Sequence, residues 1–333
     1  MVGKQQVILS FDYELFFGDR SGTVQKTLIE PTNIILDAMD SVGFKGNFFV
    51  DWQMLKYLKE EGTERTNIDY DLIEKQLLDI VRRGHRIELH IHPHWVDAKY
   101  NGDGTWDFSD FTHYSLNSFT IDEIVVIFRE GYNLLTSIAR KVDPSYTLCA
   151  FRAGGWAVQP FDKVKHGLDA VGIKLDSSVM PGFKITCQHS KCDFLDSIEN
   201  KFGFFHYSDN VCREDCAGHY IEVPITTIIP GFFYKLVRKV SKLLGMNFNS
   251  LADGTHVRSK DKPDLWEVPE GRSIATFSSC NPICAAIIPF YSNSDVVCFI
   301  DHPKDVSKYT AAGITLLGHY FSESLLYRDI ISK

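Results

Sequence analysis

The chain has 333 residues, a net charge of −8 at neutral pH, and 44% hydrophobic against 23% charged residues. This is ordinary globular composition, and the acidic balance argues against nucleic-acid binding, which needs a basic face. Neither a secretory signal pattern nor an uninterrupted apolar run of about 18 residues is found, so we expect a cytoplasmic protein without a transmembrane helix. The totals do not indicate an oligomeric state.

Strands and amphipathic helices alternate along the first part of the chain. A buried strand is predicted over 7–14, a helix begins at Pro31, and a second strand covers 46–50. A helix over 69–83 leads to the alternating segment 87–91, which is typical of a strand. This order predicts parallel strands joined by right-handed crossovers.

The same order continues through the rest of the chain. Thr120 and Glu123 form a capping box for a helix that runs to about Lys141. The other predicted elements are strands at 147–151, 172–178 and 296–300, a short helix at 161–171, and a closing helix at about 311–330. Residues from about 181 to 290 break this rhythm. We interpret the chain as a single domain, 1–333, with a partly β insertion at about 181–290 that walls one side of a cleft.

The cysteines have two interpretations. Free thiols are the default for a cytoplasmic chain. The alternative is a structural metal site in a cluster whose members are Cys187, His189, Cys192, Cys212, Cys216 and His219. The cysteine pairs have four and three intervening residues instead of the two that are usual in a compact zinc site, so free thiols are favoured.

Three histidines lie within five residues at the end of the segment 87–91. They are His90, His92 and His94. The strand period places His90 and His92 on the same face, and Pro93 then ends the strand. Imidazoles at this spacing indicate a metal site.

Acidic side chains occupy the corresponding end of the first strand. Asp12 and Glu14 follow its buried apolar residues and share one side of an extended backbone. Because the carboxyl ends of parallel strands meet at one edge of a sheet, we expect these acids and the histidines to share one site.

Five strand-end segments, taken in chain order, resemble the motifs of a known family. The segments are Ser10–Glu14, His90–His94, Phe151–Trp156, Asp176–Ser178 and Asp301–Pro303. Together they resemble the polysaccharide deacetylase (NodB-like, carbohydrate esterase 4) family, in a cytoplasmic branch. The resemblance covers about 7–179 and the end from 296. It implies an α/β fold, a distorted, incomplete (β/α)7-type barrel, and metal-dependent removal of N- or O-acyl groups from amino sugars.

The resemblance also implies catalytic roles. Asp12 matches the catalytic base of the family, and Arg152 matches the arginine that orients this base. His302 matches the general acid that protonates the leaving group, and Asp176 resembles the carboxylate that tunes His302.

The implied metal ligands are Glu14, His90 and His94. The family usually has an Asp directly after the base, and this chain has Tyr13 there. Glu14 is the nearest acid on the same side of the strand as Asp12, so it is the implied ligand. His90 and His94 have the family spacing, and His92 is the alternative to His94. Zinc is the expected metal, because it prefers nitrogen and oxygen ligands. Whether Asp12 also binds the metal is left open.

We therefore predict hydrolytic deacetylation of an N-acetylated or O-acylated sugar, an intermediate of surface polysaccharide or lipopolysaccharide biosynthesis. Two alternatives stay open. One is a hydrolase of small non-sugar amides on the same fold. The other is a non-catalytic saccharide-binding relative, which the departure at Tyr13 supports.

A second kind of partner is suggested by residues 232–244. Their apolar side chains share one helical face, and four basic side chains lie elsewhere on the helix. An ordinary packed helix with a solvated basic side is the favoured interpretation. Peripheral contact with an anionic membrane is the alternative.

Overall fold

A computed structural model of the chain describes residues 5–187, 190–197, 200–256, 265–267, 271–278 and 280–332, without the side chains of 187, 190 and 265–267. Its main sheet contains β1 (Gln6–Tyr13), β2 (Asn47–Asp51), β3 (Arg86–Ile91), β6 (Ala150–Ala153), β7 (Leu175–Asp176), β10 (Phe205–Tyr207), β11 (Tyr220–Glu222), β15 (Val296–Asp301) and β16 (Ser324–Leu325). The spatial order is β10-β11-β7-β6-β3-β2-β1-β15, with β16 beside β1. β10 is antiparallel to β11, and the other pairs are parallel.

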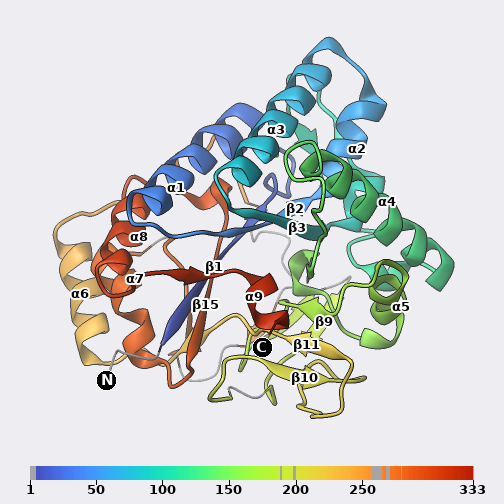
Figure 1. Cartoon of the computed structure of the whole chain (residues 1–333). Helices are drawn as coiled ribbons and strands as arrows, with labels where there is room; N and C mark the ends of the chain where they lie inside the picture. Colours follow the sequence, from blue (N-terminus) through green and yellow to red (C-terminus); the bar gives the residue numbers. More distant parts are fainter. Residues whose placement is uncertain are drawn as a thin grey trace.

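Helices connect these strands (Figure 1). They are α1 (Glu30–Ser41), α2 (Trp52–Glu61), α3 (Glu64–Arg82), α4 (Ile121–Ala139), α5 (Phe161–Val171), α6 (Phe232–Leu243), α7 (Pro282–Ile287), α8 (Thr310–Gly318) and α9 (Tyr327–Ile331). Among the described residues, none of the helices combines the length and the apolar content that a membrane span requires.

Three small antiparallel sheets complete the structure. Their strands are β4 (Lys99–Tyr100) with β5 (Trp106–Asp107), β12 (Thr227–Ile228) with β14 (Ser273–Ile274), and β8 (Lys184–Cys187) between β9 (Ser190–Asp193) and β13 (Leu265–Glu267). Two strands from within 181–290, β10 and β11, extend the main sheet. This segment therefore contributes to the central architecture as well as to the periphery.

Alternate residues of β1 enter two different apolar clusters. Val7, Leu9 and Phe11 pack in the large core with side chains of the helices. Ile8 enters a smaller cluster with Tyr327 of α9. The sheet is strongly curled (Figure 1), and the smaller cluster lies on the face opposite the large core, which we call the inside of the curl. The predicted class is confirmed: an α/β protein with a mostly parallel half-barrel sheet, consistent with a distorted, incomplete barrel.

The local predictions have mixed outcomes. The capping box at Thr120 is confirmed at the start of α4. The closing helix predicted at 311–330 is wrong, because α8 ends at Gly318 and a strand precedes α9. In that strand, Ser324 pairs with Val7 at the edge of β1. Its hydroxyl accepts a hydrogen bond from the Lys45 N–H and donates one to the Lys45 carbonyl, both at 2.6 Å. Long-range pairing therefore overrides the helical pattern.

Candidate metal centre and active site

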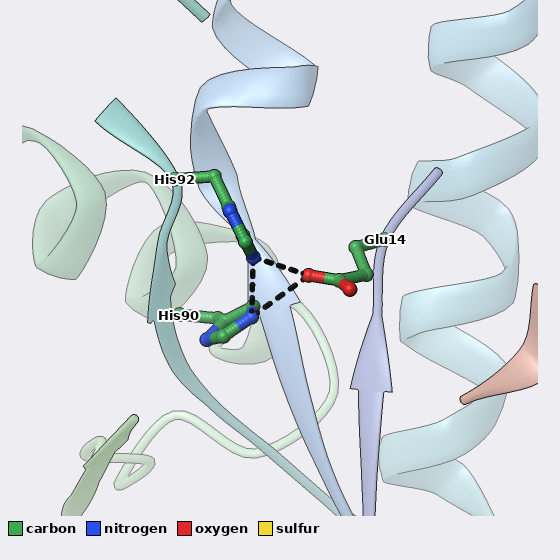
Figure 2. Close-up of side chains that lie close together, drawn as sticks. All are labelled: Glu14, His90 and His92. Carbon is green, nitrogen blue, oxygen red and sulfur yellow. Dashed lines mark hydrogen bonds and ion pairs between the residues drawn. The ribbon is translucent and has the colours of Figure 1, made fainter. Parts of the chain in front are cut away.

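A carboxylate and two imidazoles meet at the carboxyl end of the central strands (Figure 2). Glu14 directly follows β1, His90 lies near the end of β3, and His92 directly follows it. Glu14 Oε2 lies 2.9 Å from His90 Nε2 and also contacts His92 Nε2, and the two Nε2 atoms are 3.0 Å apart. Among the residues that the structure describes, no other group of three or more His, Cys, Asp or Glu side chains converges closely enough to hold a metal ion.

This donor set fits a divalent cation. His90 Nδ1 lies 2.8 Å from the backbone carbonyl of Arg152, and a carbonyl oxygen only accepts, so the ring proton is on Nδ1 and the Nε2 lone pair faces the cluster. Burial lowers the pKa of His92 to about 4, so this ring is neutral at neutral pH. Burial also lowers the pKa of His90, but the carboxylates of Asp12 and Glu14 raise it further, so the result lies above the ordinary value, and a cation bound at Nε2 would have to displace a proton there. Ligand atoms roughly 3 Å apart are what a single zinc ion with bonds of about 2.0–2.2 Å requires.

The position of His92 depends on its neighbours. Its ring packs on Phe17, with the ring centroids 4.2 Å apart. On the other side, a Cβ atom at Gly154 would lie 2.6 Å from His92 Nδ1. Only glycine at residue 154 leaves room for this ring position.

The structure places His92, and not the first-choice ligand His94, beside Glu14 and His90. The strand period ends at His92, because Pro93 begins a 3₁₀ turn that changes the direction of the next side chain. His94 packs instead among aromatic rings, namely Phe17, Phe108 and Tyr114. The geometry thus supports the alternative that the strand period allows and corrects the assignment of His94.

Asp12 and Arg152 form a buried ion pair next to the three candidate ligands. Arg152 Nη1 donates to Asp12 Oδ1 at 2.5 Å. The other guanidinium contacts are Ser10 Oγ, the carbonyl and hydroxyl oxygens of Ser177, Tyr327 Oη and the ring face of Phe49. Asp12 Oδ2 faces the site, at 3.9 Å from His90 Nε2. One carboxylate oxygen is therefore held and the other is available for chemistry.

His302 faces both carboxylates from the end of β15. Its Nε2 lies 3.6 Å from Asp12 Oδ2 and 3.6 Å from Glu14 Oε1, and 18% of its side chain is exposed. Its Nδ1 lies 3.4 Å from Asp305 Oδ2. Solvent can therefore reach His302. Sequence reasoning misses Asp305. Its position three residues after His302, in the turn that begins at Pro303, is a signal that could have indicated the contact.

Asp176 does not lie beside His302 in the described structure. In the sheet register, Asp176 is level with Phe151 of β6 and with Glu222 of β11. Phe151 packs in the large helix-side core, so Asp176 points to that side, whereas Arg152, the next residue along β6, points to the inside of the curl. The implied role of Asp176 in tuning His302 is corrected for this reason.

Asp176 and Glu222 form a separate buried acid pair. Burial raises the pKa of Asp176 to about 6, although the Ser178 hydroxyl, which donates to Asp176 Oδ1 at 2.6 Å, lowers it in part. Burial and the adjacent Asp176 raise the pKa of Glu222 well above its usual range. Asp176 Oδ2, Glu222 Oε2 and the hydroxyl of Tyr207 have no hydrogen-bond partner among the described residues. The pair therefore retains a proton at pH values where ordinary carboxyls are ionised.

A buried lysine that no sequence pattern marks completes the site. Lys304 Nζ donates to Glu14 Oε1 at 2.6 Å and to the carbonyl of Leu15 at 3.2 Å. Burial raises the pKa of Glu14, but the Lys304 ammonium and His92 lower it further, so the result lies well below the usual range. Glu14 is therefore ionised, with one oxygen toward the histidines and the other toward Lys304.

The cysteine cluster gives no support for a second metal. Cys212 and Cys216 are free thiols. His189 and the side chain of Cys187 lie outside the described residues. Within the described part of the chain, no cysteine belongs to a group that could hold a metal ion.

Comparisons with known proteins add structural similarities at low sequence identity. No family model and no curated protein matches the chain. A candidate polysaccharide deacetylase from Mycobacterium smegmatis is 12% identical, with 99% of this chain and 89% of that chain covered and a TM-score of 0.44. A 4-alpha-glucanotransferase from Thermococcus litoralis is 13% identical, with 99% and 40% covered and a TM-score of 0.49. A family 4 carbohydrate esterase from Bacillus anthracis is 21% identical, with 46% and 50% covered and a TM-score of 0.24.

Proposed function

We propose that this protein is a metal-dependent hydrolase that removes an acyl group from an N-acetylated or O-acylated sugar. The observation that supports it best is the convergence of Glu14, His90 and His92 directly beside Asp12 and His302. When bound there, a divalent cation such as zinc would supply Lewis-acid chemistry, which polarises an acyl carbonyl and makes water a better nucleophile.

The protein's own residues account for the proton transfers. As water adds to the acyl carbon, Asp12 Oδ2 accepts a proton, while Arg152 holds Oδ1 and fixes the direction of the carboxylate. When the bond from the acyl carbon to nitrogen breaks, the departing amine needs a proton. His302 Nε2, 3.6 Å from Asp12 Oδ2 and partly exposed, is placed to donate it. The products from an N-acetylated sugar are a carboxylic acid and a free amine, and an O-acylated sugar would give a hydroxyl group in place of the amine.

The physiological setting belongs to the same proposal. We propose a cytoplasmic reaction on a saccharide intermediate of surface polysaccharide or lipopolysaccharide biosynthesis. Cell fractionation tests the location. Assays with N-acetylated sugar nucleotides, lipid-linked saccharides and small non-sugar amides test the substrate class.

One observation favours a second candidate, a saccharide-binding protein without catalytic activity. The Lys304 ammonium already lies 2.6 Å from Glu14 Oε1, so the site contains a positive charge without any metal. Asp12→Asn distinguishes the two candidates. If the protein is a hydrolase, the variant should keep its metal, and its rate of deacetylation of an N-acetylated sugar should fall by about 100-fold or more. If it is a binding protein, neither the wild type nor the variant should deacetylate the sugar, and their saccharide affinities should be equal.

A further inference from the structure

The helix α6 presents its apolar side chains to solvent. The exposed residues are Phe232 (81%), Phe233 (53%), Leu236 (42%), Val240 (43%) and Leu243 (77%), followed by Leu244 (74%) just after the helix. Of the residues within α6, only Tyr234 and Ser241 are buried. The helix lies at the left edge of Figure 1, beside α7 and apart from α2, α4 and α5. The expectation of an ordinary packed helix is therefore wrong for this face.

The outward orientation of the apolar face is fixed by contacts on the opposite side. Tyr234 and Ser241 are seven residues apart, about two turns, so both point to the protein body. Ser241 Oγ accepts a hydrogen bond of 2.8 Å from Asn281 Nδ2, and Tyr234 Oη lies 3.7 Å from Cys280 Sγ. The helix cannot turn to bury its leucines and phenylalanines without losing these contacts.

The charge of α6 is opposite to that of the whole chain. The helix contains Lys235, Arg238, Lys239 and Lys242 and no acidic residue, although the chain carries a net charge of −8. Within the described residues, none of these four side chains makes an ion pair. At about 100° per residue, the basic side chains occupy the flank next to Phe232 and Leu243, opposite Val237.

This combination fits one kind of partner. We propose that α6 binds the surface of a bilayer containing anionic lipids, with its phenylalanines and leucines among the acyl chains and its basic flank at the headgroups. A second copy of this chain fits less well, because a symmetric pairing would bring two sets of four cations together. The inference does not depend on the proposed hydrolase activity.

Vesicle sedimentation of the full chain tests this proposal. We expect the protein to bind vesicles of mixed phosphatidylcholine and phosphatidylglycerol, to bind pure phosphatidylcholine much less, and to be released by salt. Lys239→Gln with Lys242→Gln should lower the partition coefficient by about 25-fold, at about fivefold per charge. Phe232→Ser with Leu243→Ser should lower it by about tenfold or more.

Matched variants elsewhere control for general changes in surface character. Ile68→Ser with Val126→Ser removes apolar side chains that are 50% and 51% exposed on α3 and α4. Lys59→Gln with Lys75→Gln removes two charges from α2 and α3. Both control variants should bind vesicles like the wild type, and circular dichroism should show that all four variants are folded.

Three results would overturn the proposal. The first is a wild type that does not sediment with anionic vesicles. The second is a control pair that weakens binding as much as the α6 pair does. The third is a dimer in sedimentation velocity that Phe232→Ser with Leu243→Ser dissociates, without vesicle binding, because α6 would then pair with a second copy.

Discussion

Two groups of buried carboxyls lie on opposite faces of the same sheet, and they have opposite charge environments. On the inner face, Asp12 contacts the Arg152 guanidinium and Glu14 contacts the Lys304 ammonium. On the helix side, Asp176 and Glu222 have each other as nearest acidic neighbours, and burial keeps the pKa of both raised. Burial is nearly complete in both groups, so the neighbouring charges, and not burial alone, account for the lowered pKa of Glu14 and the raised pKa values of Asp176 and Glu222.

The difference separates two functions within one fold. Carboxylates that are ionised and directed by cations can bind a metal and accept protons. Two neighbouring acids with raised pKa values are neutral at low pH, and they repel each other as they ionise at higher pH. Removing one partner from either group should therefore have opposite consequences for stability.

The largest effect is expected from Arg152→Met. It leaves Asp12 as an unpaired charge in a buried site, so we expect the free energy of unfolding to fall by about 3–5 kcal/mol, measured by urea denaturation. Adding Asp12→Asn to this variant should restore part of the loss. If Arg152→Met unfolds at the same urea concentration as the wild type, the ion pair does not stabilise the fold.

The next largest effect is expected at the candidate metal site. His92→Gln should lower zinc affinity by about 100-fold or more, because it removes one of three ligands, whereas His94→Gln should leave the affinity unchanged. Elemental analysis after gentle dialysis, and titration with a competing chelator, measure both. Loss of metal in His94→Gln with retention in His92→Gln would reverse the assignment of these two side chains.

The pair of Asp176 and Glu222 should make the stability of the protein depend on pH. Because the folded pKa of Asp176, about 6, lies above its unfolded value, the folded state binds more protons, and stability falls as pH rises through about 6. Glu222→Gln can donate a hydrogen bond to ionised Asp176, so it should flatten this dependence. We expect the variant to gain about 2 kcal/mol over the wild type at pH 8 and almost nothing at pH 4. Equal slopes of stability against pH in the variant and the wild type would contradict the coupling of these two acids.

The smallest effect is expected at Lys304, which lies beside Glu14 and has no counterpart beside Asp176 and Glu222 among the described residues. Its ammonium neutralises Glu14 and repels a bound cation, so Lys304→Met should raise zinc affinity by about tenfold. Lys304→Arg retains the charge and should leave zinc affinity close to that of the wild type. A weaker zinc affinity in Lys304→Met would show that Lys304 mainly holds the Glu14 carboxylate in position.

Much of the fold could be predicted from local patterns. The alternation around Leu89 and the capping box at Thr120 are local signals, and the structure confirms the α/β class that they predict. The pairing of Ser324 with β1 could not be predicted in this way, because it depends on a strand edge more than 300 residues earlier in the chain. Helical propensity near the end of the chain therefore misled the prediction of the closing helix.

The candidate site shows the same limit. Strand period alone groups His90 with His92, and the structure agrees, whereas family spacing selected His94 and neglected the turn after Pro93. Asp176 was assigned from its place in a motif, without the register that sets its face of the sheet. Lys304 was missed because a lysine in a loop is usually solvated, and only the folded chain brings it to Glu14.

The pairing of β1 has a consequence for how the protein is made. The strand that carries Asp12 is flanked by β15, where Gln6 pairs with Val296, and by β16, where Val7 pairs with Ser324. Tyr327 also places its hydroxyl 3.2 Å from Arg152. During synthesis, β1 emerges shortly before its partner β2 but long before β15 and β16, which also pair with it. The pairing of β1 and the contacts of Arg152 are therefore complete only after residues 296–327 have been made, and such long-range pairing is slow to form.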